Sequence, residues 1–131
     1  MITYKQIQEL NSADLKELFL SVGWESGKDS VMLSIAMAKA TRVITAWDGK
    51  KLVGLIRSMD DGIWSANIDC LVVHKDYQHK GVGAMLLKKM VKALKAIKYI
   101  NVCPDSKDNI SFYQQFGFKL INGAYLQLQK N

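Results

Sequence analysis

The sequence is poor in proline, with a single residue, and poor in cysteine, with only Cys70 and Cys103. Two cysteines are too few for a disulfide framework, which favours a reducing compartment. No apolar run approaches the roughly 18 residues that a membrane helix needs. The first residues, Met1–Gln6, lack the apolar core of a signal peptide. We therefore predict a soluble, cytoplasmic protein with no membrane partner.

Metal-ligand clusters and nucleic-acid motifs are missing as well. The histidines, His74 and His79, and the cysteines lack the spacing of a zinc site, so we expect no metal. The chain has 18 Lys and Arg against 12 Asp and Glu, a net charge of +6, which suits anionic partners. The lysines of the predicted helix 81–97 lie opposite an apolar stripe, without interleaved aromatic residues. A solvated helix face explains them better than a nucleic-acid surface, and we expect no such partner.

Length and composition fit one ordinary globular domain over residues 1–131, with 49% hydrophobic and 23% charged residues. Alternating β-branched runs predict strands and helical periodicity predicts helices, in an order that gives an α/β or α+β fold with a mixed sheet. The predicted strands are 2–7, 42–47, 51–57, 63–74 and 99–103, and the predicted helices are 11–22, 28–39, 81–97 and 106–115. A closing hairpin is predicted from 118–121 and 125–128, around Asn122 and Gly123.

The strongest chemical signal lies between the strand 63–74 and the helix 81–97. The strand ends in an aliphatic run, and Gly81 and Gly83 open the helix. A helix N-terminus presents unpaired N–H groups with partial positive charge, and glycine lets an anion approach the backbone closely. The loop therefore predicts an anion site, with phosphate as the favoured anion and a plain strand-to-helix turn as the alternative. No P-loop is present, and Leu86 stands where a dinucleotide fingerprint requires a third glycine.

Two motifs about thirty residues apart, Gln78–Gly83 and Asn109–Phe118, carry a family resemblance. They resemble the (Arg/Gln)-x-x-Gly-x-(Gly/Ala) loop and the Phe-Tyr helix ending in Gly-Phe of the GNAT superfamily of acyl-CoA-dependent N-acetyltransferases. Shorter strings, Ser21–Trp24 and Leu52–Arg57, are similar to its chloroplast and cyanobacterial arylalkylamine (serotonin-type) branch. The resemblance implies a GNAT-like fold: a mostly antiparallel mixed sheet, two splayed parallel central strands and about four helices.

The resemblance implies acetyl-CoA as cosubstrate. Its pantetheine arm would enter the gap between the strands 63–74 and 99–103 and pair with backbone groups at the end of the first. Backbone N–H groups of the loop would hold the pyrophosphate. The residues implied for this role are Leu71, Val72, Val73, Gln78, His79, Lys80, Gly81, Val82, Gly83, Ala84, Asn109 and Phe112. The related branch usually has glycine at the position of His79, although histidine tolerates a left-handed φ better than most residues.

The resemblance also implies direct transfer of the acetyl group to a primary amine. Tyr113 would donate a proton to the departing thiolate, and a core aromatic is its alternative role. The candidate general bases, acting through water, are Asp69, Glu25, Asp60 and Asp61. The related branch tends to carry an acidic residue where this chain has Cys70. Because adjacent strand residues point to opposite faces, Asp69 replaces that residue only if a bulge resets the register.

Trp24 and Trp64 are candidates for stacking on an aryl or cationic amine, and core packing is the alternative role of each. The favoured function is acetyl transfer to a small arylalkylamine or polyamine-like amine. A protein-lysine acetyltransferase and a non-catalytic CoA-binding sensor are the alternatives. Tyr113 argues against the sensor, and the altered position at Cys70 argues for it. A homodimer is a further expectation, with the closing hairpin as its contact.

Overall fold

The computed structural model describes residues 1–123 and 126–130. Its strands are β1 (Ile2–Lys5), β2 (Arg42–Asp48), β3 (Lys51–Asp60), β4 (Ser65–Val73) and β5 (Tyr99–Val102). Its helices are α1 (Ser12–Ser21), α2 (Ser30–Lys39), α3 (Val82–Ala93) and α4 (Ile110–Gln114), with short 3-10 turns η1 (Glu25–Asp29), η2 (Lys75–Tyr77) and η3 (Lys107–Asn109). The predicted α/β architecture with about four helices is confirmed.

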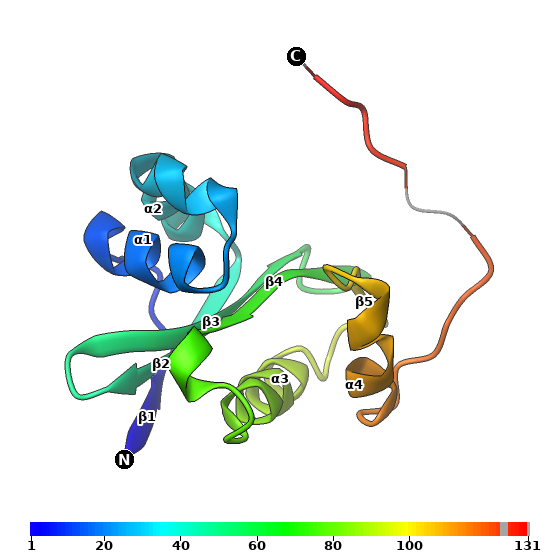
Figure 1. The fold of residues 1–131 in the computed structure, drawn as a ribbon. Coiled ribbons are helices and arrows are strands. Elements are labelled where there is room, and N and C mark those ends of the chain that lie inside the picture. Colours follow the sequence, from blue (N-terminus) through cyan, green and yellow to red (C-terminus); the bar gives the residue numbers. More distant parts are fainter. Residues whose placement is uncertain (124–125, 131) are drawn as a thin grey trace.

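The five strands form one mixed sheet in the order β1-β2-β3-β4-β5. The first four strands pair antiparallel, and β4 and β5 pair parallel. The helices α1 and α2 cover one face of this sheet, and α3 and α4 lie on the other (Figure 1). The sheet is therefore mostly antiparallel with one parallel pair, as predicted.

Each face of the sheet buries its own apolar cluster. The helical spacing of α3 directs Leu86 and Met90 onto one face, and α1 directs Leu15 onto the other. Since successive strand residues point to opposite faces, β3 serves both clusters, with Ile56 in the first and Leu55 in the second. Each fully buried leucine contributes roughly 1.5–3 kcal/mol. The two clusters hold the middle of the sheet rigid from both sides.

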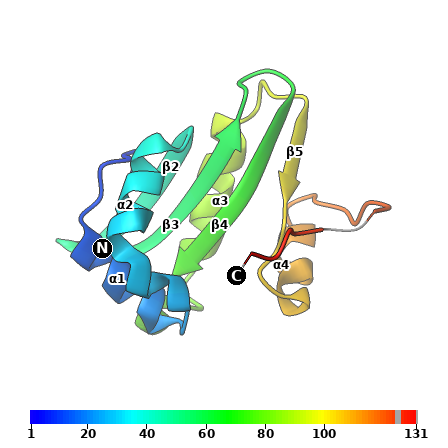
Figure 2. The same cartoon turned by 90° about the horizontal axis from the view of Figure 1, so that it is seen from above.

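The strands β4 and β5 pair over four positions only, from Ser65 opposite Tyr99 to Ile68 opposite Val102. The strand β4 continues to Val73, while β5 ends and turns away (Figure 2). On its other side, the end of β4 stays paired with β3 as far as the Gly54–Val73 pair. The predicted splay is thus confirmed, and it leaves one backbone edge of β4 free of a strand in the described part of the chain.

The predicted closing hairpin is wrong where the structure describes it. Residues 118–121 and 126–128 are irregular, and Tyr125 lies outside the described residues. The Asn122-Gly123 pair is a local turn signal, whereas a two-stranded hairpin is stable only with further strands or a packed face. Here the chain leaves α4 and runs away from the sheet (Figure 1). In the described part of the chain β5 is consequently an edge strand.

Candidate functional site

A cavity of about 510 Å³ lies between the end of β4, the start of α3 and α4. This volume is in the range of small-molecule sites. All but one of the residues predicted for the cosubstrate line it; the exception is Lys80. The lining consists of Val22, Trp24, Leu71, Val72, Val73, Tyr77, Gln78, His79, Gly81, Val82, Gly83, Ala84, Asp105, Asn109, Phe112 and Tyr113. The fold thus brings together both sequence motifs, which are far apart in the chain.

The N-terminus of α3 supplies backbone donors to this cavity. Gly81 caps the helix with a left-handed φ of 83°, and its carbonyl accepts the helical bond from the Met85 N–H at 3.0 Å. The N–H groups of 82–84 precede that bond, so they belong to the turn that has no intrahelical acceptor. The helix dipole adds partial positive charge at the same place. These donors can hold an anion that enters the cavity.

Gly83 keeps the cavity floor clear. A methyl group at this position would lie 3.5 Å from Val73 Cγ2 and 3.8 Å from Phe112 Cζ, which is ordinary van der Waals contact. The neighbouring residues therefore leave enough room at position 83 for a methyl group, although the residue there is glycine. A glycine that is not required by its neighbours fits a close approach of a ligand to the backbone.

His79 adopts a left-handed φ of 62°, and it is the only such non-glycine residue in the described part of the chain. A non-glycine residue in this region costs about 1–2 kcal/mol, less for types that tolerate it. The loop thus keeps the conformation for which glycine is suited, although the chain places histidine there. Backbone strain of this kind is concentrated at ligand-binding loops.

Side chains tie the loop to the sheet. The Gln78 amide donates to the Val73 carbonyl at 3.1 Å, and the Tyr77 hydroxyl donates to Asp48 Oδ2 at 2.6 Å. The Lys80 ammonium lies 5.5 Å from the centroid of the Tyr77 ring, and Lys80 does not line the cavity. These contacts fix the loop before any ligand is present, and pre-organisation reduces the cost of binding.

Tyr113 is buried at the wall of the cavity. Its ring packs edge-on against Phe112 at 5.1 Å and against Phe118 at 5.9 Å. Burial, followed by the negative charge of Asp105, raises the pKa of Tyr113 to about 12. The phenol is therefore protonated near neutral pH and can donate a hydrogen bond or a proton. The core-aromatic role and the donor role are both compatible with this position.

A bulge in β4 decides where Asp69 points. Arg57 pairs with Cys70 and the next β3 residue, Ser58, pairs with Ile68, so Asp69 is the inserted residue. Asp69 Oδ1 lies 3.5 Å from Arg57 Nε, and Asp69 does not line the cavity. The register reset that the prediction required is present. Burial raises the pKa of the Cys70 thiol to about 12, which keeps it protonated and excludes a ready thiolate nucleophile.

The other predicted bases lie elsewhere. Asp60 Oδ2 accepts from Arg42 Nε at 3.0 Å, and Asp61 Oδ1 accepts from the backbone N–H groups of 63–65. The latter bonds lower the pKa of Asp61. Asp60 is the last residue of β3 and Asp61 follows it in the turn to β4, whereas Glu25 is in η1 and forms an exposed ion pair. None of the three lines the cavity, and the carboxylates of Asp60 and Asp61 already accept the bonds just described.

The two tryptophans that were candidates for stacking lie in different parts of the structure. Trp24 lines the cavity and packs edge-on against Phe19 at 5.6 Å. Trp64 precedes β4 and packs against Tyr99 at 5.3 Å, whereas the cavity lies at the far end of β4, roughly 30 Å along the strand. The direction of β4 thus places Trp64 outside the cavity, which gives its predicted stacking role no support.

Sequence reasoning missed Asp105 and Tyr77, which both line the cavity. Asp105 accepts a hydrogen bond from the Asn109 side chain and lies in the loop after β5. Its position was a usable signal, because ligands of parallel strands bind outside their carboxyl ends. Among the described residues, no group of three or more His, Cys, Asp or Glu is placed to hold a metal, and no helix there is long and apolar enough to cross a membrane.

Curated relatives align with most of the length of this chain. A protein of Pyropia yezoensis named as the uncharacterized N-acetyltransferase ycf52 is 28% identical over 116 residues, covering 85% of this chain and 66% of that protein. The chloroplastic GCN5-related N-acetyltransferase 2 of Arabidopsis thaliana is 31% identical over 133 residues, covering 85% of this chain and 51% of that protein. The chain therefore spans between half and two-thirds of the length of these relatives.

Solved structures share the fold. A GNAT family acetyltransferase from Streptococcus pneumoniae is 28% identical with a TM-score of 0.82, covering 99% of this chain and 100% of that one. A protein from Deinococcus radiodurans has a TM-score of 0.84 at 23% identity, which supports the fold alone. The family profile described as the acetyltransferase (GNAT) domain matches residues 39–120, well over half of the sequence. With the splayed strands, the loop and the helix motif in place, this match shows that the chain belongs to the GNAT acetyltransferase family.

Proposed function

We propose that the protein transfers an acetyl group from acetyl-CoA to a primary amine. The observation that carries the proposal is one cavity lined by three features: the free edge of β4, the N-terminal amides of α3 and the side chain of Tyr113. Acetyl-CoA would supply a reactive thioester. An anion site, an unpaired strand edge and a proton donor are what binding and cleaving that thioester require.

Cosubstrate binding rests on backbone groups. The N–H groups of 82–84 would hold the pyrophosphate at the start of α3. The edge of β4 over Leu71–Val73 would pair with the amides of the pantetheine arm, as a strand pairs with a sheet edge. Asn109 and Phe112, from the second motif, flank the same cavity. The clear floor at Gly83 fits an arm lying close against the backbone.

Tyr113 would assist departure of the thiolate. A protonated phenol donates a hydrogen bond to the sulfur as charge develops there. Because burial raises the pKa of Tyr113 to about 12, complete proton transfer to a thiolate of pKa about 8.5 is uphill. Tyr113 therefore acts mainly as a hydrogen-bond donor and transfers its proton late.

The amine must lose a proton before it attacks, since an alkylamine of pKa about 10.4 is almost fully charged at pH 7. We assign Asp69 as the general base, acting through water. The bulge beside Cys70 and the half-exposed position of Asp69 support this role. Asp105 is the second candidate because it lines the cavity itself. Replacing each by asparagine distinguishes them: the variant of the true base loses rate most at low pH.

For the acceptor we propose a small arylalkylamine or polyamine-like amine. Trp24 supports it, since an indole ring in the lining can stack on an aryl group or a cation. A lysine side chain of a protein is the alternative acceptor, and a CoA sensor without catalysis is the alternative function. Residues 1–131 would act as one domain in the cytoplasm; the relative from Arabidopsis thaliana is named as chloroplastic.

The test is a thiol-release assay with acetyl-CoA across a panel of amines: tryptamine, serotonin, a polyamine, an aminoglycoside and a lysine peptide. Tyr113→Phe is measured beside it, with Tyr4→Phe, outside the cavity lining, as the matched control. We expect turnover on one amine class, with kcat lowered about 100-fold in Tyr113→Phe and the KM for acetyl-CoA nearly unchanged. CoA binding without turnover on any amine would favour the sensor, and no CoA binding would refute the proposal.

A further inference from the structure

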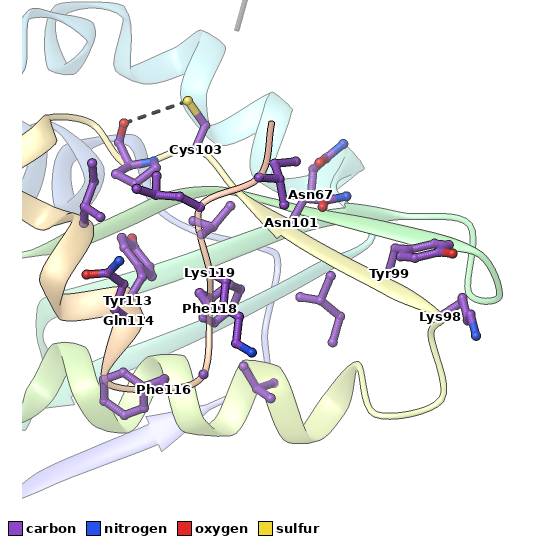
Figure 3. Close-up of a pocket in the computed structure, with 18 residues that line it drawn as sticks. Asn67, Lys98, Tyr99, Asn101, Cys103, Tyr113, Gln114, Phe116, Phe118 and Lys119 are labelled. Carbon is purple, nitrogen blue, oxygen red and sulfur yellow. Dashed lines mark hydrogen bonds between the residues drawn. The ribbon is translucent and has the colours of Figure 1, made fainter. Parts of the chain in front are cut away.

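Histidine and carboxylate side chains are distributed unevenly around two cavities of the molecule. A second cavity, of about 630 Å³, lies between β5 and α4, and its lining among the described residues contains no His, Asp or Glu (Figure 3). At the end of β4, in contrast, the buried His74 lies beside Glu17 of α1 and opens the loop that leads to α3. His74 is a buried titratable group that the proposed acetyl transfer does not use.

His74 caps the 3-10 turn η2 with both its side chain and its backbone. The Asp76 N–H donates to His74 Nδ1 at 3.1 Å, and the Tyr77 N–H donates to the His74 carbonyl at 2.8 Å. The remaining N–H of the turn, from Lys75, donates to Ser21 Oγ of α1 at 3.2 Å. Every backbone donor of η2 therefore has a partner, and His74 supplies two of them.

The bond from Asp76 fixes where the His74 ring carries its proton. Nδ1 accepts a hydrogen bond, so it holds no proton, and the neutral ring has its proton on Nε2. A second proton would occupy Nδ1 and turn this atom from an acceptor into a donor that faces the Asp76 N–H. Protonation of the ring and the side-chain cap of η2 therefore exclude each other.

The groups around the ring confine the change to Nδ1. Nε2 lies 3.5 Å from Glu17 Oε1 and carries a proton in both forms of the ring, so this contact persists. The same Glu17 oxygen lies 3.5 Å from Lys51 Nζ. The charged groups around the ring and its neighbour Tyr77 are Glu17 on α1, Asp48 on β2, Lys51 on β3, Asp76 in η2 and Lys80 in the loop.

The turn η2 connects the ring to the cavity proposed for acetyl-CoA. The His74 ring packs edge-on against Tyr77 at 5.8 Å, and Tyr77 lines that cavity. The residue before His74 is Val73, at the end of the free edge of β4, and the loop runs on from η2 through Gln78 to the first amides of α3. Loss of the cap of η2 therefore acts on the loop whose shape places those amides.

We propose that His74 is a positioning residue: its neutral ring holds the loop 74–81 in the shape that binds CoA, and a second proton on Nδ1 releases η2. The proposal rests on the proposed use of acetyl-CoA as cosubstrate. The binding-competent loop holds one proton fewer than the released loop, so the affinity for CoA falls as the pH drops through the range in which histidine side chains titrate. His79, which lines the cavity, predicts the opposite sign, because its protonation adds positive charge that attracts an anion.

The first test is titration calorimetry of CoA with the full chain at about pH 8 and about pH 5.5, which bracket the titration of histidine. The 3′-phosphate of CoA takes up a proton in this range with every variant, so the ratio of the two Kd values is compared between variants. In His74→Asn the amide oxygen accepts from the Asp76 N–H at either pH, as asparagine does at an N-cap. We expect the ratio of the wild type to exceed that of His74→Asn by about fivefold or more, and His79→Asn to keep at least the wild-type ratio.

A second variant, His74→Leu, separates capping from packing. Leucine keeps a bulky apolar side chain but offers no acceptor, so the Kd for CoA at high pH should be about three- to tenfold higher than in His74→Asn. A ring that only packs predicts the reverse order, with leucine closer to the wild type than the smaller asparagine. Circular dichroism at both pH values checks that each variant is folded.

The second test follows the ring without CoA. Proton–nitrogen correlation spectra of the free wild-type chain should show the proton of the neutral His74 ring on Nε2, and the Asp76 amide signal should move as the ring titrates. A neutral ring with its proton on Nδ1, equal Kd ratios in the wild type and His74→Asn, or the reverse order of the asparagine and leucine variants would each overturn the proposal and leave the proposed acetyl transfer intact. A wild type that binds no CoA at high pH would refute the proposed function, and the role of His74 with it.

Discussion

The two ends of β4 use similar loops in opposite ways. Before β4, the carboxylates of Asp60 and Asp61 accept bonds from Arg42 and from the backbone N–H groups of 63–65, so this turn satisfies its own donors. After β4, the loop leads into α3 with its first amides directed at a cavity. At one end, acidic residues that are candidate bases in the sequence accept hydrogen bonds within the turn; at the other, backbone N–H groups lie at the cavity. The feature that distinguishes the cavity after β4 is its backbone N–H groups without an intrahelical acceptor, rather than charged side chains.

The largest effect is expected for Gly83→Ala, in the first turn of α3. The added methyl fits against Val73 and Phe112, and alanine is favoured over glycine inside a helix by roughly 0.5–1 kcal/mol. We expect a higher Tm together with a Kd for CoA raised at least about tenfold, because the methyl takes the space of the ligand. Gly49→Ala, in the turn between β2 and β3 with a φ of 60°, is the control. It should lower Tm and leave the CoA affinity unchanged; equal CoA affinity in both variants would contradict the assignment.

The two tryptophans extend the test to the acceptor. Trp24→Leu should raise the KM for the amine about tenfold with little change for acetyl-CoA, because an indole–cation contact contributes on the order of 1 kcal/mol. Trp64→Leu, at the opposite end of β4, should leave both KM values unchanged. Steady-state kinetics with each substrate varied separately measure the difference. An increase in the amine KM for Trp64→Leu alone would reverse the placement of the acceptor.

For the turn before β4, we predict that a substitution changes the stability of the fold and not the binding of ligands. Backbone donors lower the pKa of Asp61, so folding favours its carboxylate. This contribution is complete above the ordinary pKa of about 3.9 and is lost as the pH falls through the lower folded-state pKa. Asp61→Ala should therefore lower Tm by about 2–5 °C at pH 7, and the gap to the wild type should narrow near pH 3. Thermal melts at the two pH values test this, and a gap that does not change with pH would argue against the charged cap.

Much of the fold and of the cavity was predictable from the sequence, and individual residues show why the remainder was not. The strand, the Gly81–Gly83 opening and Tyr113 follow from periodicity and two motifs, and the structure places them in one cavity. The closing hairpin failed because Asn122-Gly123 specifies a turn, while a strand also needs a partner edge. Trp64 lies at the start of β4, away from the cavity at the end of that strand, and the direction of a strand within a sheet is not given by its residues alone. The bulge at Asp69 depends on pairing with β3, which a single strand's sequence does not reveal.

The smallest effect is expected at His79, where the loop is strained by its own residue. Glycine at this position removes the cost of a φ of 62°, but it also gives the unfolded chain more freedom. The two changes nearly cancel in stability, so His79→Gly should shift Tm by no more than about 2 °C. His79→Ala carries the strain without the tolerance of histidine and should lower Tm more clearly. Because the loop already has this φ without a ligand, the strain is equal in the free and bound states, and His79→Gly should leave the Kd for CoA nearly unchanged, as measured by titration calorimetry. A marked loss of CoA affinity in His79→Gly, matched in His79→Ala, would instead mean that the imidazole itself contacts the ligand. In that case the loop after β4 would bind with a side chain as well as with backbone, and the contrast between the two ends of the strand would weaken accordingly.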